Sequence, residues 1–105
     1  MSQQPEVTAE VAGPSDAELI TAVRSGDTAA FATLFTRHSA AARGLARSLA
    51  RDHAEADDLV SESFTKILQI LRDGGGPDTA FRPYLYTTLR RVAYDRTRAN
   101  QRVRS

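Results

Sequence analysis

Apolar residues recur along this chain at steps of three and four, and this spacing constrains its fold more than any other feature. Between residues 31 and 49 the repeat places one set of side chains on a single helix face, at about 100° per residue. That face holds Phe31, Leu34, Phe35, His38, Ala42, Leu45 and Leu49. No four-residue window combines alternating hydrophobicity with β-branched residues, so no strand is predicted. The sequence therefore predicts an all-α fold.

The first two helices have clear end signals. Ser15 and Glu18 have the spacing of a capping box, and Gly26 stands where a glycine ends a helix. Asp27 is then placed to cap the helix that carries the repeat. Gly44 lies inside this second helix, where a glycine costs about 1 kcal/mol relative to alanine. We therefore expect another helix to cross closely at Gly44.

A third helix is predicted from about Ala54 to Leu71. We expect Glu55, Asp57 and Asp58 in its first turn, where the helix dipole favours negative charge. Its inward face is predicted to hold Ala56, Val60, Ser63, Phe64, Ile67, Ile70 and Leu71. The opposite, polar face holds Asp58, Ser61, Glu62, Thr65 and Gln69.

The strongest interruption of the helical pattern is the run Arg-Asp-Gly-Gly-Gly-Pro-Asp at residues 72–78, which predicts a loop. A fourth helix follows, from near Pro83 to about Ala99. These segments predict a compact bundle of about four helices, in one domain over residues 15–100. Residues 1–14 are polar and contain two prolines and a glycine, so we expect a disordered tail. Residues 101–105 are expected to begin a linker.

Composition excludes several classes of protein. The chain has no cysteine, which excludes disulfides, thiolate metal sites and cysteine nucleophiles. It has no apolar run near the roughly 20 residues that span a bilayer, and its N-terminus lacks the basic start and apolar stretch of a secretory signal. We therefore expect a cytoplasmic protein without a membrane segment.

Charge is distributed unevenly along the chain. Residues 1–80 carry seven basic and twelve acidic side chains, a net charge of −5, whereas residues 81–105 carry seven arginines and one acid, a net charge of +6. This asymmetry predicts two surfaces with different partners, one of them polyanionic. Arginine outnumbers lysine, and Lys66 is the only lysine. That bias suits bidentate contacts with phosphate and base edges, but a genome rich in G and C explains it equally well.

The fourth helix is predicted to be amphipathic in an unusual way. Leu85, Leu89 and Val92 point to one side, with Thr88 and Ala93 at the edges. Thr87, Arg91, Tyr94 and Arg98 fall on the opposite side, within about 60° of one another, and Arg90 flanks them. Arginine binds phosphates, and a tyrosine ring stacks on unpaired bases, so this face suits nucleic acid. The alternative is a solvated face on which Tyr94 only covers the edge of the bundle.

Three segments carry a resemblance to a known family. The segments are DAELITAVRSGDTAAFATLFTRH, DHAEADDLVSESFTKIL and FRPYLYTTLRRVAYDRTR, in that order. Together they resemble conserved region 2 of the extracytoplasmic function (ECF) sigma factors, over about Ser15 to Arg104. The most specific part is D-D-L-V-x-E-x-F-x-K, Asp57 to Lys66, followed by F-R-P-Y-L-Y. The resemblance implies a sigma region 2 fold and a transcription initiation factor that is not an enzyme and needs no cofactor.

The resemblance also implies a contact with RNA polymerase. In the family, the third helix binds the clamp helices of the polymerase β′ subunit. In this sequence the matching residues are Asp57, Asp58, Ser61, Glu62 and Lys66. An acidic helix face complements a basic partner, although without the resemblance the same acids would indicate only a solvated face. Ser61 stands where the family commonly has glutamine.

Promoter DNA is the second implied partner. Residues 73–80 match the family's specificity loop, which captures a base flipped out of the −10 element. Three glycines would let backbone amides approach a nucleotide closely, but they equally suit a flexible connection. The implied DNA-binding residues are Asp78, Arg82, Tyr84, Tyr86, Thr87, Arg90, Arg91, Tyr94 and Arg98. Thr87 and Thr88 stand where housekeeping sigma factors have the tryptophan pair that melts DNA, a lack that ECF factors share.

The expected partners are thus the polymerase core and −10 promoter DNA, including unpaired non-template bases, with an anti-sigma factor as a further partner. The ECF family's second, helix-turn-helix domain is missing from the sequence, so we interpret the chain as the first domain.

Two other functions remain open from the residues. One is a protein-interaction module of sigma ancestry, such as a decoy, and the other is a generic basic helical DNA-binding regulator. Catalysis is not expected, because Ser39, Ser61 and Ser63 lack the surroundings of an activated nucleophile. His38 lies in the apolar stripe and is predicted at the edge of the core, and His53 lacks a ligand-like partner pattern, so no metal site is expected.

Overall fold

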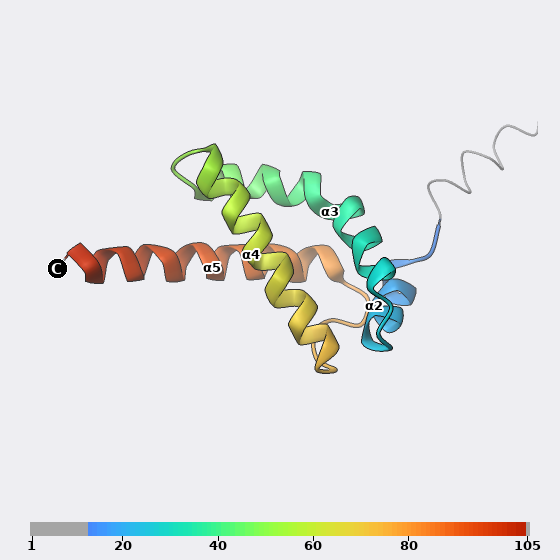
Figure 1. Cartoon of the computed structure of the whole chain (residues 1–105). Helices are drawn as coiled ribbons and strands as arrows, with labels where there is room; N and C mark the ends of the chain where they lie inside the picture. Colours follow the sequence, from blue (N-terminus) through green and yellow to red (C-terminus); the bar gives the residue numbers. More distant parts are fainter. Residues whose placement is uncertain (1–12, 105) are drawn as a thin grey trace, which may run out of the picture.

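The computed structural model describes residues 13–104, and these residues form four α-helices without a strand (Figure 1). The helices are α2 (Asp16–Arg24), α3 (Thr28–Leu49), α4 (His53–Arg72) and α5 (Phe81–Arg104). The predicted all-α bundle is confirmed. Residues 1–12 of the predicted tail lie outside the described residues.

The end signals of the first two helices act as predicted. The Ser15 hydroxyl accepts a hydrogen bond from the Glu18 backbone N–H at 3.1 Å, and the Glu18 carboxylate accepts one from the Ser15 N–H at 2.9 Å. Gly26 follows α2 with a φ of +100°, a left-handed conformation that favours glycine. The Asp27 side chain accepts a hydrogen bond from the Ala30 N–H at the start of α3. These contacts set where α2 begins and ends and where α3 begins.

The core lies where the four helices meet. Helix α3 packs against α2, α4 and α5, and α4 also contacts α2 and α5. Phe64 of α4 lies at the centre, with ring centroids 4.7 Å from Phe35 and 6.1 Å from Phe31, both of α3, and 6.2 Å from Phe81 of α5. The largest apolar side chains without exposed surface around this cluster are Ile20, Leu34, Ile67, Leu71, Leu85 and Leu89. This aromatic cluster joins three of the helices.

The inward face of α4 is close to the one predicted. Six of the seven predicted residues are buried, and only Ile70 is half-buried. Leu59 is also buried, which the sequence pattern did not predict. In α3, by contrast, the apolar stripe runs past the core, because Leu49 is exposed at its C-terminal end.

Two local predictions were wrong. Gly44 is exposed, and a Cβ added there would meet no atom within 4 Å, so no helix crosses closely at this position. In α4, only Glu55 lies in the first turn, because the Asp52 side chain caps a helix that already begins at His53. Asp57 and Asp58 therefore lie beyond that turn.

Helix α5 extends past its predicted bounds at both ends. It begins at Phe81, so Pro83 is its third residue, where an N–H is not needed because the first turn has no intrahelical acceptor. At the other end nothing in residues 97–104 interrupts a helix, since neither glycine nor proline occurs there. Residues 101–104, expected to begin a linker, are therefore helical.

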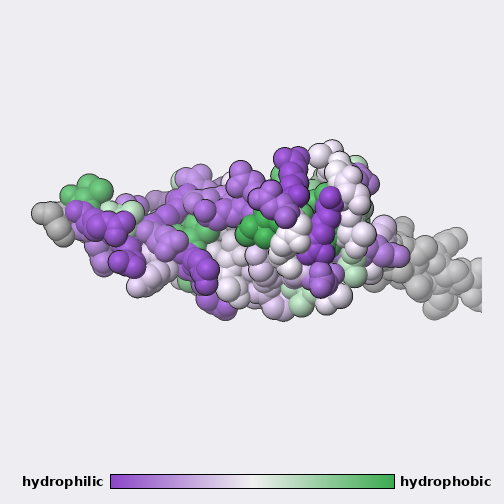
Figure 2. Space-filling model, turned by 90° about the horizontal axis from the view of Figure 1, so that it is seen from below, coloured by the Kyte–Doolittle hydropathy of each residue, from purple (hydrophilic) through white to green (hydrophobic). Residues whose placement is uncertain are grey.

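The long α5 runs through the molecule and projects beyond α3 and α4 at its C-terminal end (Figure 1). Figure 2 shows that polar side chains cover most of the face seen from below, with small, separate apolar patches. Within residues 13–104, no helix has the length and apolar character to cross a membrane.

Candidate nucleic-acid interface

One side of α5 is open to solvent and carries the predicted set of side chains. Leu85, Leu89 and Val92 are buried in the core. On the opposite side, the exposed residues are Thr87, Arg90, Arg91, Tyr94 and Arg98. We call these five residues the α5 stripe. The helix-wheel prediction of which residues face outward is confirmed.

Tyr94 and Arg98 form a pair within the α5 stripe. The Tyr94 side chain is 61% exposed, and the Arg98 guanidinium carbon lies 5.7 Å from the centroid of its ring. This cation–π contact holds the arginine one turn along the helix from the tyrosine. Tyr94 therefore presents its ring to solvent, and the interpretation that it only covers the edge of the bundle does not hold.

The other predicted DNA-binding residues lie nearer the start of α5 and are tied into the fold. Tyr84 and Tyr86 are half-buried and pack against the core. Arg82 is exposed, but its Nε donates a hydrogen bond to His38. Asp78, in the preceding loop, pairs with Arg24.

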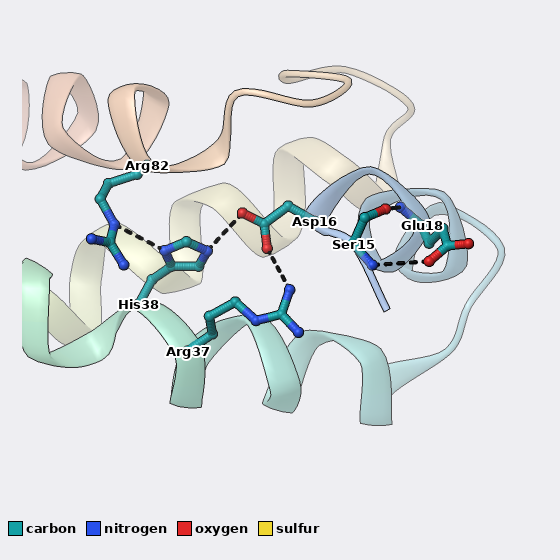
Figure 3. Close-up of polar contacts among 6 residues, drawn as sticks. All are labelled: Ser15, Asp16, Glu18, Arg37, His38 and Arg82. Atoms are coloured by element: carbon teal, nitrogen blue, oxygen red, sulfur yellow. Dashed lines mark hydrogen bonds and ion pairs between the residues drawn. The ribbon is translucent and has the colours of Figure 1, made fainter. Parts of the chain in front are cut away.

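A chain of polar contacts joins Arg82 to α2 through His38 (Figure 3). Arg82 Nε donates to His38 Nδ1 at 3.2 Å, and His38 Nε2 lies 2.9 Å from Asp16 Oδ2. Because an arginine only donates hydrogen bonds, Nδ1 must carry a lone pair, and the proton must lie on Nε2, which donates to Asp16. The other Asp16 oxygen accepts from Arg37 Nη1 at 2.9 Å. The network is satisfied only by a neutral imidazole.

The surroundings of His38 favour that neutral form. Burial lowers the pKa of His38, the attraction and hydrogen bond of Asp16 oppose this, and the positive charges of Arg82 and Arg37 lower it further. The ring also lies 4.9 Å from Phe81, centroid to centroid. His38 was predicted at the edge of the core, and the structure leaves only 4% of it exposed.

The glycine-rich loop is held by one arginine that the sequence did not single out. Arg24, the last residue of α2, donates from Nη2 to the carbonyl oxygens of Gly75 (2.8 Å), Pro77 (3.0 Å) and Gly76 (3.3 Å). Its Nη1 donates to Asp78 Oδ1 at 2.9 Å. Spacing rules do not reveal this contact, because Arg24 and the loop are more than fifty residues apart.

The polar face of α4 brings together the predicted polymerase-binding residues. Asp58 and Ser61 are exposed on it, and Asp57 and Lys66 are exposed at its edges, with Asp57 paired to Arg43 of α3 at 3.6 Å. Glu62 differs, because it is half-buried and accepts hydrogen bonds from Arg96 Nε at 3.1 Å and Nη2 at 2.9 Å. This pair links α4 to α5.

Comparison with known families identifies the domain. The family model for sigma-70 region 2 matches residues 34–103, about two thirds of the chain. The chain belongs to the sigma-70 region 2 family. Searches of curated proteins and of solved structures found no match.

The family gives this domain a role as a sigma factor in transcription initiation. Sigma-70 region 2 domains are non-enzymatic, and in general they bind the RNA polymerase core and −10 promoter DNA. The match includes the polar face of α4, the glycine-rich loop and the α5 stripe, but it begins at Leu34. Helix α2, with Asp16 and Arg24, lies outside it.

Proposed function

We propose that this chain is region 2 of an ECF sigma factor, which docks on the β′ clamp helices through α4 and reads and melts the −10 promoter element through α5. The observation that carries the DNA half of this proposal is the exposure of Arg91, Tyr94 and Arg98 on the side of α5 opposite its buried leucines. A cytoplasmic location follows from the polymerase partner.

The chemistry of the α5 stripe suits DNA whose strands have separated. Its arginines neutralise phosphates. The exposed ring of Tyr94 offers a face on which an unpaired base can stack, a contact worth about 1–3 kcal/mol per base. Thr87 is exposed, whereas the Thr88 hydroxyl donates to the Tyr84 carbonyl at 2.9 Å within the helix. With threonines in place of a tryptophan wedge, melting relies on capture of the open form. Binding that form more tightly than the duplex shifts the equilibrium towards it.

The exposed acids of α4 support the polymerase half. Asp58 presents negative charge on a helix face that the core does not use, which complements a basic partner helix and accelerates docking, whereas Asp57 already pairs with Arg43 of α3 at 3.6 Å. A generic DNA-binding regulator would have no need of such a face. Pull-down of the polymerase core through β′ distinguishes the proposal from that alternative, and transcription from a −10 promoter distinguishes it from a decoy.

The DNA half is tested with single-stranded oligonucleotides that carry a −10 element varied base by base. We expect Arg91→Ala and Arg98→Ala each to weaken binding and to reduce the slope of log K against log salt by about 0.7, the loss of one phosphate contact on a single strand. The control is Arg47→Ala, which removes an exposed arginine from α3. Equal losses for the Arg47 variant would show that only net charge matters and would refute the assignment of the α5 stripe.

A further inference from the structure

We propose that Arg24 is the positioning residue of the glycine-rich loop: it holds residues 75–78 in the conformation that receives a flipped base. This inference rests on the proposed function, because it concerns how the same DNA site is built. It adds a residue of α2, which lies outside the part of the chain that the family match covers.

The geometry of the contact is that of a clamp. One guanidinium donates to three successive carbonyl oxygens, those of Gly75, Gly76 and Pro77, and to the carboxylate of Asp78. The three carbonyl contacts come from Nη2 and the contact with Asp78 from Nη1, so the two arms of the planar guanidinium span the loop, whereas the ammonium of a lysine is a compact point charge. The Asp78 side chain is 86% exposed, so the ion pair is largely screened and the carbonyl contacts carry most of the restraint.

The loop needs such a restraint because its own sequence favours many conformations. Gly74 and Gly76 adopt φ values of +90° and +85°, and glycine loses more backbone freedom on ordering than any other residue. Two hydrogen bonds tie the start of the loop to α4, from the Gly74 N–H to Leu71 and from the Gly75 N–H to Ile70. Arg24 holds the following segment, which those two bonds do not reach.

The residues at the end of the loop carry backbone N–H groups that can donate hydrogen bonds to the edge of a base. Asp78, Thr79 and Ala80 are exposed, and within residues 13–104 no hydrogen bond uses their backbone N–H groups. Because the Pro77 carbonyl and the Asp78 N–H share one peptide plane, fixing that carbonyl fixes where the Asp78 N–H points. Arg24 thereby orders the receptor for the base before DNA arrives.

Preorganisation predicts the size of the effect. If the loop occupies its competent conformation about one tenth of the time without Arg24, the apparent affinity for the captured base falls about tenfold. The phosphate contacts of α5 are separate and should persist, so the salt dependence of binding should not change.

The test measures binding of single-stranded −10 oligonucleotides, intact or with an abasic site at each position in turn. For the wild type we expect one abasic position, that of the captured base, to weaken binding strongly. For Arg24→Gln we expect about tenfold weaker binding to the intact strand, an unchanged salt slope and no further loss at that abasic position. Arg24→Lys, which keeps the charge and the aliphatic stem but replaces the guanidinium with a single nitrogen, should behave like Arg24→Gln.

Arg72→Gln is the matched control, since it removes an exposed arginine at the end of α4, next to the loop, and should retain the abasic penalty. If folded Arg24→Lys lost as much affinity at that abasic position as the wild type does, the inference about Arg24 would be overturned, while the proposed function would stand. A wild type that is indifferent to every base and every abasic site would instead refute the proposed function, and this inference with it.

Discussion

At the scale of single residues, the protonation of His38 decides whether the contact between Arg82 and the core is made. A second proton would go to Nδ1, the atom that accepts from Arg82 Nε. The imidazolium would then face two cations, Arg82 and Arg37, with only Asp16 to compensate. The neutral ring is therefore part of the folded structure.

This arrangement predicts a pH dependence of stability. Because the pKa of His38 in the folded protein lies below its ordinary value of 6.5, the unfolded chain takes up the proton more readily. The contribution of neutral His38 to the free energy of unfolding should be complete above pH 6.5, and it should decrease as the pH drops towards the folded-state pKa. Urea unfolding of the wild type between about pH 7.5 and pH 5 measures it.

The matched variant for this prediction is His38→Gln, whose amide offers both a donor and an acceptor but does not titrate. Its free energy of unfolding should fall less over the same pH interval than that of the wild type. Parallel curves for the two proteins would show that His38 is not the titrating group.

The sequence predicts which helix faces are buried better than it predicts which side chains contact one another. Apolar spacing alone assigned Leu85, Leu89 and Val92 to the core and left Tyr94 outside, because burial follows from helix geometry. His38 contacts Asp16 and Arg82, which lie 22 and 44 residues away in the sequence. These contacts depend on how the helices pack, and local residue spacing does not reveal them.

At the scale of secondary-structure elements, α3 contains a residue that weakens it without benefit to the fold. Gly44 is exposed in the helix interior, and an added Cβ meets nothing there. We expect Gly44→Ala to raise the free energy of unfolding by about 1 kcal/mol, which denaturant unfolding measures. Gly26→Ala, at a φ of +100°, should instead destabilise the protein. A loss of stability in the Gly44 variant would mean that this glycine has a role that its surroundings do not reveal.

Element boundaries were predicted less well than element identity, for local reasons. The Ser15 capping box and Gly26 are specific signals, and α2 begins and ends where they indicate. Helix α5 has no such signals at its ends, and Pro83, which predicts a helix start, is its third residue. The loop between α4 and α5 was predicted from its glycines, but its restraint by Arg24 was not, because the restraint is tertiary.

At the scale of the whole molecule, the two charged faces lie on neighbouring helices, and an ion pair between Glu62 and Arg96 joins these helices. Glu62 of α4 accepts two hydrogen bonds from Arg96 of α5, so a change at Glu62 would disturb both faces. Asp58 is exposed on α4, and Arg91 is exposed on α5. Asp58 and Arg91 are therefore the residues that separate polymerase binding from DNA binding.

The most direct measurement titrates Asp58→Ala and Arg91→Ala against both ligands, the polymerase core and a single-stranded −10 oligonucleotide. We predict that Asp58→Ala weakens binding to the polymerase core by about fivefold or more and leaves the DNA affinity unchanged, and that Arg91→Ala does the reverse. If both variants weakened binding of the same ligand to the same extent, the chain would not have two functional faces, and the account would be contradicted.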